Sequence, residues 1–197
     1  MSAGLQGADS YLDVFVLRHG QSRAQTGEEL GMDTGLSEHG RIQAKKAGEI
    51  LSLSVWDRIL CSPLLRAVET LECLHLQEKD SVGAVKDIRL AENTGKEDDN
   101  PGGRAESLLR ELSDMASGEP AVRRVLIISH AMFLSSLLEV FICPSGAGAE
   151  HECGVYARLG NARLGFLRIP RQTGMMRVVA GWNISPQDLQ NSEDGSF

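Results

Sequence analysis

The sequence contains no run of apolar residues as long as the roughly 18 that suggest a membrane span. Residues 1–10 also lack the basic segment and the apolar stretch of a secretory signal. Neither a transmembrane helix nor a cleaved leader is therefore expected, and a cytoplasmic location is the default expectation.

An excess of positive charge is missing too. The 197 residues carry a formal net charge of -7, whereas nucleic acids and acidic membrane surfaces bind proteins with basic faces. Nucleic acid and membrane are therefore not expected as partners. Any phosphate site in this acidic protein has to be a local positive pocket.

Cysteine pairs with Cys-x-x-Cys spacing are absent. Cys61 lies inside a predicted buried strand, where a thiol acts as a small apolar group. All four cysteines, Cys61, Cys73, Cys143 and Cys153, are therefore expected to be reduced and structural. Cys143 and Cys153 flank a glycine-rich loop, so a redox role for this pair stays open.

Signatures of metal and nucleotide sites are absent as well. The tripeptide His151-Glu152-Cys153 contains metal-ligand residue types, but no second cluster has suitable spacing. The glycines form neither a phosphate-binding P-loop nor a dinucleotide fingerprint. The sequence therefore predicts no metal and no other cofactor.

What the chain does have is an alternation of strand-length apolar runs with helical patterns. Strands are predicted at 13–17, 57–62, 85–91 and 124–129, and helices at 38–53, 63–76, around 108–115 and at 132–141. This alternation is typical of β-α-β units and a parallel sheet. The short runs 155–159, 163–169 and 176–182 have no helices between them, so they are expected to complete the sheet, partly in antiparallel direction.

The predicted fold class is α/β, a three-layer α/β/α sandwich with a mixed, mostly parallel central sheet of about six strands. No linker divides the chain, so residues 11–184 are expected to form a single domain. Residues 1–10 are expected to be a flexible N-terminus, and the polar tail 185–197 is expected to be disordered.

Charged and polar side chains follow the predicted strands. Because the carboxyl ends of parallel strands meet at the same edge of a sheet, these side chains are expected to face one crevice. A guanidinium can bind two phosphate oxygens, and a neutral imidazole can attack phosphorus. The groups in question are Arg18 with His19, Ser62 with Arg66, Glu92, and Ser129 with His130.

Apart from Glu92, these groups lie in the first, third and fourth of four segments, Leu17-Arg18-His19-Gly20-Gln21-Ser22, Asp33-Thr34-Gly35-Leu36-Ser37-Glu38-His39-Gly40-Arg41-Ile42-Gln43-Ala44, Cys61-Ser62-Pro63-Leu64-Leu65-Arg66-Ala67-Val68-Glu69-Thr70 and Val125-Leu126-Ile127-Ile128-Ser129-His130. In this order they resemble the signature segments of the histidine phosphatase superfamily, also called the phosphoglycerate mutase-like proteins. The resemblance extends over residues 14–169. Within the superfamily, the chain is most similar to short phosphatase-type members without a lid.

This resemblance implies a role for each polar residue. His19 would be the nucleophile that takes the phosphoryl group, while Arg18, Arg66 and His130 would hold its oxygens. Glu92 would donate a proton to the leaving oxygen. Nearby arginines are expected to keep His19 neutral, and burial or the charge of the phosphate is expected to keep Glu92 protonated.

The chain departs from the family pattern at Gln21, Gln25, Gly35 and Ala131. Many members have an acidic residue and an asparagine at the first two positions, a proline at the third and a glycine at the fourth. The amide of Gln25 and the backbone N–H of Ala131, at a helix start, are still expected to bind phosphate.

Each site residue also has a purely structural interpretation. His19 could be an ordinary loop histidine, and Arg66 could pair with Glu69 or Glu38. His130 could cap a helix, and Glu92 begins a charged run of the kind that is usually solvated.

The segment between Glu92 and His130 bears on the reaction, because the mutases carry a long insertion there that excludes water. This chain has one predicted loop and one helix, and an open pocket favours hydrolysis. We therefore expect a metal-independent phosphatase that hydrolyses phosphomonoesters through a phosphohistidine on His19, acting on a phosphorylated small molecule or a phosphoprotein. The alternatives are a cofactor-dependent phosphoglycerate mutase, a phosphohistidine or phosphoprotein phosphatase, and a noncatalytic phosphate-binding module. The oligomeric state is not predicted.

Overall fold

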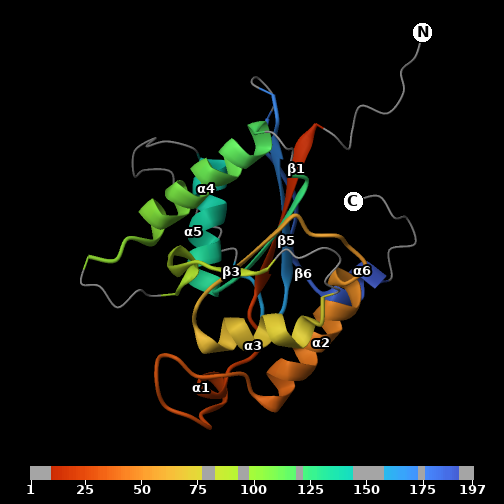
Figure 1. Ribbon diagram of the computed structural model, residues 1–197. Helices are drawn as coiled ribbons and strands as arrows, with labels where there is room; N and C mark the ends of the chain where they lie inside the picture. The colour runs from red at the N-terminus through yellow and green to blue at the C-terminus, as the bar shows by residue number, and fades with distance from the viewer. Residues whose placement is uncertain are drawn as a thin grey trace.

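The computed structural model describes residues 10–76, 83–92, 98–118, 122–143, 158–172 and 176–190. Its centre is a six-stranded sheet with the strand order β3-β2-β4-β1-β5-β6 and helices on both faces (Figure 1). The strands are β1 (Tyr11–Arg18), β2 (Arg58–Cys61), β3 (Val85–Lys86), β4 (Arg124–Ser129), β5 (Leu164–Pro170) and β6 (Val178–Ile184). The predicted α/β fold with a mixed sheet is confirmed.

The first four strands of the chain run in the same direction, whereas the pairings made by β5 with β1 and by β6 with β5 are antiparallel. β4 pairs with β1 on one side and with β2 on the other, both in parallel, while β5 pairs with β1 in antiparallel direction and β6 pairs with β5 in the same way. The carboxyl ends of β2, β4 and β1 therefore lie next to one another. Their common edge is the end of the molecule where α1 lies (Figure 1).

The helices form two layers. α2 (Glu38–Leu51) and α3 (Leu65–Leu74) pack against each other on one face of the sheet, and α4 (Pro101–Ser117) and α5 (Ala131–Ile142) do so on the other. The short helices are α1 (Arg23–Thr26) and α6 (Pro186–Gln190). Ser37 caps α2, as predicted, by accepting a hydrogen bond from the Gly40 N–H at 3.1 Å.

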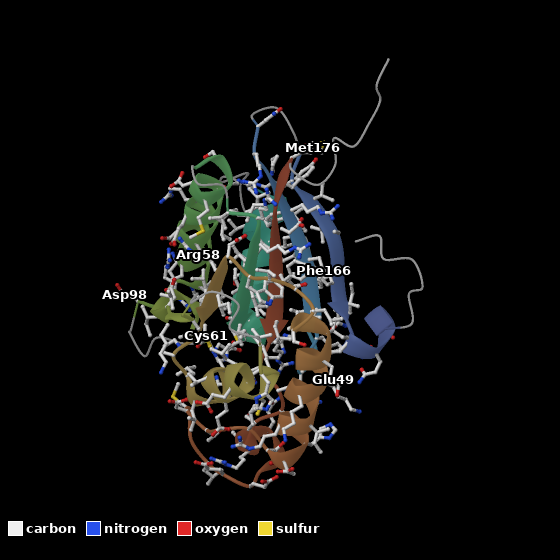
Figure 2. All side chains as sticks on the ribbon, turned by 45° about the vertical axis from the view of Figure 1, so that its right-hand side comes forward. Glu49, Arg58, Cys61, Asp98, Phe166 and Met176 are labelled. Carbon is white, nitrogen blue, oxygen red and sulfur yellow. The ribbon has the colours of Figure 1, made fainter. Side chains whose placement is uncertain are left out.

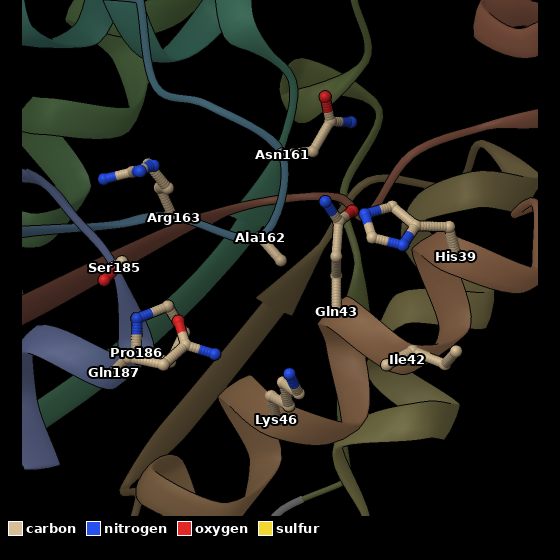
Figure 3. Close-up of a pocket in the computed structure, with 10 residues that line it drawn as sticks. All are labelled: His39, Ile42, Gln43, Lys46, Asn161, Ala162, Arg163, Ser185, Pro186 and Gln187. Atoms are coloured by element: carbon tan, nitrogen blue, oxygen red, sulfur yellow. The ribbon is translucent and has the colours of Figure 1, made fainter.

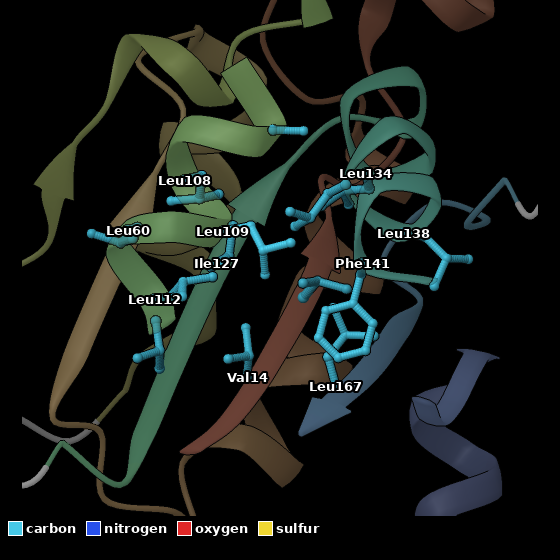
Figure 4. Packing of buried hydrophobic residues seen from close by; sticks show 14 of the residues in the cluster. Val14, Leu60, Leu108, Leu109, Leu112, Ile127, Leu134, Leu138, Phe141 and Leu167 are labelled. Atoms are coloured by element: carbon cyan, nitrogen blue, oxygen red, sulfur yellow. The ribbon is translucent and has the colours of Figure 1, made fainter. Parts of the chain in front are cut away.

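The apolar run of β4 is buried on both faces of the sheet. Because side chains alternate along a strand, Val125 and Ile127 pack toward α4 and α5 (Figure 4), whereas Leu126 and Ile128 pack toward α2 and α3. Figure 2 shows side chains filling the space on both sides of the sheet. Burial of each such side chain stabilises the fold by about 1.5–3 kcal/mol.

Helix α2 lies unusually close to the loop that follows β1. A Cβ atom on Gly40 would come within 2.0 Å of the backbone oxygen of Gln21, so only glycine fits at this point of the helix. This close approach fixes the loop that carries His19.

The strand predicted at 85–91 is wrong in its length. β3 has only two residues, and a 3-10 turn, η1 (Ile88–Leu90), follows it. The Asp87 side chain accepts a hydrogen bond from the Arg89 N–H at 2.9 Å and also binds the Arg89 guanidinium. Because the carboxylate offers the backbone a local partner, the chain turns instead of continuing the strand.

The remaining predictions concern the C-terminal third and the cysteines. β5 and β6 confirm the antiparallel strands, but Arg158 and Leu159 belong to no strand, and 155–157 lie outside the described residues. In the tail, 186–190 form helix α6 instead of being disordered, while 191–197 and 1–9 are outside the described part.

Cys61 and Cys73 are free and buried, Cys143 is free and exposed, and His151, Glu152 and Cys153 lie outside the described ranges. Within those ranges, no helix is long and apolar enough to cross a membrane.

Candidate active site

The carboxyl ends of the parallel strands bring two histidines together. His19 directly follows β1 and His130 directly follows β4, and their ring centroids are 5.0 Å apart. Arg66, in the first turn of α3, reaches the same place, with its Nε 3.3 Å from Nε2 of His19. The structure thus joins residues that the sequence separates by more than a hundred positions.

The hydrogen bonds of His19 define its tautomer. Its Nδ1 lies 2.6 Å from the carbonyl oxygen of Gly20, which can only accept a hydrogen bond, so Nδ1 carries the proton. Nε2 is then the nitrogen that carries the lone pair, and it accepts a hydrogen bond from Nε of Arg66. Burial of the ring, followed by the charges of Arg66 and Arg18, lowers the pKa of His19 to about 3. The imidazole is therefore neutral at physiological pH, as predicted.

Arg66 is held in place from several directions. Its Nη1 donates to the carbonyl of Met32 at 2.9 Å, and its own carbonyl accepts from the Thr70 hydroxyl at 2.7 Å. Glu69, its alternative ion-pair partner in the sequence, binds Arg41 at 2.8 Å instead. The guanidinium therefore faces His19.

His130 is completely buried at the N-cap position of α5, but its side chain makes no capping hydrogen bond. Instead, its Nε2 lies 2.7 Å from the hydroxyl of Ser62, at the end of β2. Burial is the main cause that lowers the pKa of His130, and the neighbouring His19, Arg66 and Arg18 lower it further. A neutral second imidazole thus faces the first.

Glu92 lies beyond η1 and touches the start of α5. Its Oε1 accepts a hydrogen bond from the Met132 N–H at 3.4 Å. Burial raises the pKa of this carboxyl, while that hydrogen bond and the charges of Arg66 and Arg18 act in the opposite direction. The net shift favours a protonated carboxyl, which is the form that can donate a proton.

Three buried polar atoms of this cluster have no hydrogen-bond partner among the described residues. They are Nε of Arg18, Nδ1 of His130 and Oε2 of Glu92. The Nη1 of Arg18 is used, because it donates to the carbonyl of Leu159 at 2.8 Å. Since buried polar groups are nearly always paired in folded proteins, such a concentration of unpaired atoms is typical of a ligand-binding site.

Gln25 and Ala131, the further predicted phosphate ligands, border the cluster. The Gln25 Oε1 accepts from the Ser22 N–H and from the Asn161 side chain, both at 3.0 Å, so its oxygen is occupied within the protein. Ala131 is the first residue of α5 and its side chain is buried. Their contact with phosphate stays a prediction. Gln21 is turned toward α2, where its Oε1 accepts from the Ser37 hydroxyl at 2.9 Å.

Sequence reasoning missed several supporting residues. Thr70 lies in one of the recognised segments, so a signal for it existed, and Ser62 was expected to face the crevice, but the hydrogen-bond partners of the two hydroxyls could not be inferred. The Thr70 hydroxyl accepts from the Gly20 N–H at 3.0 Å and so links α3 to the His19 loop. Asn161 carries no motif, yet its Nδ2 lies 3.4 Å from the carbonyl oxygen of His19. Arg104, on α4, was equally without a signal in the sequence, and its Nη1 donates to the carbonyl of Ala91, next to Glu92, at 2.7 Å.

The described part of the chain contains no group of three or more His, Cys, Asp or Glu residues arranged to hold a metal ion. The cluster instead combines two arginines, two neutral histidines and one carboxyl with a raised pKa. Guanidinium groups bind oxyanions, and an imidazole lone pair is a nucleophile. The arrangement suits the transfer of an anionic group such as phosphoryl.

The fold and this cluster define an α/β protein in which two histidines and two arginines meet at the carboxyl edge of the sheet. A family comparison makes the class specific. Residues 14–101 match the model of the histidine phosphatase superfamily, branch 1. The resemblance to that superfamily is thereby confirmed.

Solved structures share the fold. Mycobacterial hydrolase 1 is 23% identical with a TM-score of 0.69, over 89% of this chain and 99% of its own. A mycobacterial glucosyl-3-phosphoglycerate phosphatase is 21% identical with a TM-score of 0.69, over 89% and 100%. The protein histidine phosphatase SixA, solved with tungstate, is 21% identical with a TM-score of 0.63, over 90% and 99%. The comparison with curated proteins gave no significant match.

Proposed function

We propose that this protein is a metal-independent phosphatase that hydrolyses phosphomonoesters through a phosphohistidine intermediate on His19. One observation carries the proposal. The Nδ1–H of His19 is bound to the Gly20 carbonyl, so the lone pair of Nε2 faces the site beside the Arg66 guanidinium. The family match and the structural relatives named as phosphatases support the same reaction class.

In the first step, the lone pair of Nε2 attacks phosphorus, and the bond between phosphorus and the leaving oxygen breaks. Arg18, Arg66 and His130 bind the phosphoryl oxygens, where preorganised donors stabilise the transition state. The protonated Glu92 gives its proton to the leaving oxygen, so an alcohol departs and Glu92 becomes a carboxylate. The raised pKa of Glu92 is consistent with this starting state.

In the second step, water attacks the phosphorus of phosphohistidine. The Glu92 carboxylate accepts the proton of that water, and the bond between phosphorus and Nε2 breaks. Inorganic phosphate leaves, and both His19 and Glu92 return to their initial states. The same carboxyl thus serves as acid and then as base.

The structure of the segment after Glu92 favours hydrolysis over mutase chemistry. Its one helix, α4, packs against α5, and its residues Leu108, Leu109 and Leu112 belong to the core. A helix used in this way covers the sheet and not the site. Within the described residues of that segment, no element is left to enclose the phosphohistidine, so water can reach it.

The test is phosphate release from p-nitrophenyl phosphate in the presence of a metal chelator. Turnover by the intact chain is expected to survive the chelator. In a His19→Asn variant it is expected to fall by on the order of a thousandfold or more, because the nucleophile is missing. When the phosphate of the substrate is labelled, an alkaline quench during turnover is expected to leave the label on the intact chain and not on the variant.

His75→Asn is the matched control, because His75 is an exposed histidine that ends α3. Its turnover is expected to equal that of the intact chain. Loss of turnover on chelation, or undiminished turnover by His19→Asn, would contradict the proposal. Absence of hydrolysis together with interconversion of phosphoglycerates, stimulated by a bisphosphate, would identify a mutase instead.

A further inference from the structure

A cavity of about 250 Å³ lies between helix α2, the turn before β5 and the start of α6 (Figure 3). Helix α2 contributes His39, Gln43 and Lys46 to its lining, and the turn before β5 contributes Asn161, Ala162 and Arg163. The start of α6 closes it from the third side. The cavity is thus built by three elements that are distant in the sequence.

The lining is basic. Among the described residues, the lining contains Lys46, Arg163 and His39 and no aspartate or glutamate. The carboxylate of Asp188, on α6, accepts from the Ser185 N–H at 3.2 Å and is not among the lining groups, although it attracts the Arg163 guanidinium. In a protein with a formal net charge of -7, a concave surface that presents Lys46 and Arg163 attracts anions from solution.

The cavity also offers neutral hydrogen-bond donors. The Gln43 Oε1 accepts from the Gln21 N–H at 2.9 Å, so its NH2 group is the end that can donate to a ligand. Arg163 uses Nη1 to bind the Asn183 carbonyl at 2.9 Å, which occupies one of the five donors of its guanidinium. Charged and neutral donors therefore surround one small space.

Three residues that line this cavity also contact the nucleophile segment. The Ala162 N–H lies 3.1 Å from the carbonyl oxygen of Arg18 and 3.2 Å from that of His19. Asn161 and Gln43 bind the same segment, at His19 and at Gln21. Ala162 has a φ of 50°, a left-handed conformation that is uncommon for a residue with a Cβ. The turn is therefore held in a costly conformation by its contacts with residues 18 and 19.

We propose that this cavity, the anion pocket, binds a small oxyanion, namely a phosphate or carboxylate group. Its volume is below the about 300–1,000 Å³ of clefts for drug-sized ligands, which suits a single ionic group. A ligand there touches the residues that hold the carbonyls of Arg18 and His19, so its binding alters turnover at His19. This second consequence rests on the proposed function, whereas the binding itself does not.

The test is calorimetric titration of the full chain with inorganic phosphate. Two sites are expected. Arg66→Gln should weaken the one at His19, and Lys46→Gln should weaken the other by at least about tenfold, with a larger loss in Lys46→Gln/Arg163→Gln, because charged donors make the strongest hydrogen bonds to oxyanions. Lys45→Gln is the matched control, since Lys45 is the exposed neighbour on α2 that does not line the cavity.

A single phosphate site that is lost in Arg66→Gln and untouched in Lys46→Gln would overturn the proposal. Lys46-dependent binding in a chain without phosphatase activity would overturn the proposed function and leave the anion pocket standing. In Lys46→Gln, a rise in KM confined to phosphate esters that also carry a carboxylate would identify the bound anion as part of the substrate. Lys46-dependent binding with unchanged KM for such esters would identify it as a free anion.

Discussion

At the scale of single residues, one hydroxyl orients the second histidine of the site. The Ser62 Oγ is 2.7 Å from Nε2 of His130, and both side chains are fully buried. The other ring nitrogen, Nδ1, has no partner among the described residues. The serine thus decides which nitrogen of His130 is available to a phosphoryl oxygen.

We predict that Ser62→Ala lowers kcat/KM for p-nitrophenyl phosphate by roughly tenfold to a hundredfold, because a misplaced group loses its alignment with the transition state. The free energy of unfolding should fall by about 1–3 kcal/mol, since Nε2 of His130 is left buried without a partner. Steady-state kinetics and urea unfolding measure the two effects.

The control is Ser135→Ala, which removes a hydroxyl that, among the described residues, bonds back to the Ala131 carbonyl of α5 at 2.8 Å. Its kinetics should be unchanged. If Ser62→Ala lost stability but kept full kcat/KM, Ser62 would be a structural residue and would have no part in orienting His130.

At the scale of secondary-structure elements, α4 holds the segment that presents Glu92. Arg104 of α4 donates from Nη1 to the carbonyl of Arg89 at 2.5 Å and to that of Ala91 at 2.7 Å. Its guanidinium also binds Asp99 at 3.0 Å and lies 5.3 Å from the centre of the Phe133 ring. One side chain therefore joins α4, the turn η1 and helix α5 next to the carboxyl.

We predict that Arg104→Gln makes turnover sensitive to the leaving group. With an alkyl phosphate, kcat/KM, which reports the first step, should fall by roughly tenfold to a hundredfold, because the poor leaving group needs the proton of Glu92. With p-nitrophenyl phosphate, whose leaving group departs without a proton, kcat/KM should change little. Glu92→Gln should give the same pattern more strongly.

Arg110→Gln serves as the control, because Arg110 is an exposed arginine of the same helix. It should leave both rates unchanged. Equal losses for both substrates in Arg104→Gln would mean that Arg104 acts on stability alone and does not position Glu92.

At the scale of the whole molecule, the fold keeps two histidines uncharged in its interior. His19 is 4% exposed and His130 is fully buried, and both pKa values are lowered, with burial as the main cause. In the unfolded chain a histidine titrates at its ordinary pKa of about 6.5. Acid therefore protonates the unfolded state first and draws the equilibrium toward it.

We predict that the free energy of unfolding is highest above pH 6.5 and falls as the pH is lowered toward 3. Between these values the unfolded state binds a proton at His19 that the folded state, with its pKa of about 3, does not bind. The loss from His19 alone should reach about 2 kcal/mol at pH 5, at about 1.4 kcal/mol per pH unit.

Urea unfolding of the intact chain and of His19→Asn between pH 7 and pH 5 measures this difference. The variant should lose less stability on acidification. His75→Asn, which changes an exposed histidine, should behave as the intact chain does. Identical pH dependence in all three proteins would mean that His19 does not carry the effect.

The sequence by itself determined the features that depend on neighbouring residues. The apolar runs of β1 and β4 end at Arg18 and at Ser129, and such runs are strands wherever both faces are covered. Ser37 is followed by a helical pattern, so the start of α2 could be predicted. The motifs around His19, Arg66 and His130 also lie within single segments, and for this reason the candidate nucleophile and its cationic partners were recognisable.

Only the tertiary structure decided which side chains meet and in which protonation state. The bond between Ser62 and His130 joins residues 68 positions apart, and that between Asn161 and His19 joins residues 142 apart. Such contacts depend on the order β2-β4-β1-β5 of the strands, which no local pattern contains. The lowered pKa values of both histidines follow from burial, which exists only once the chain has folded.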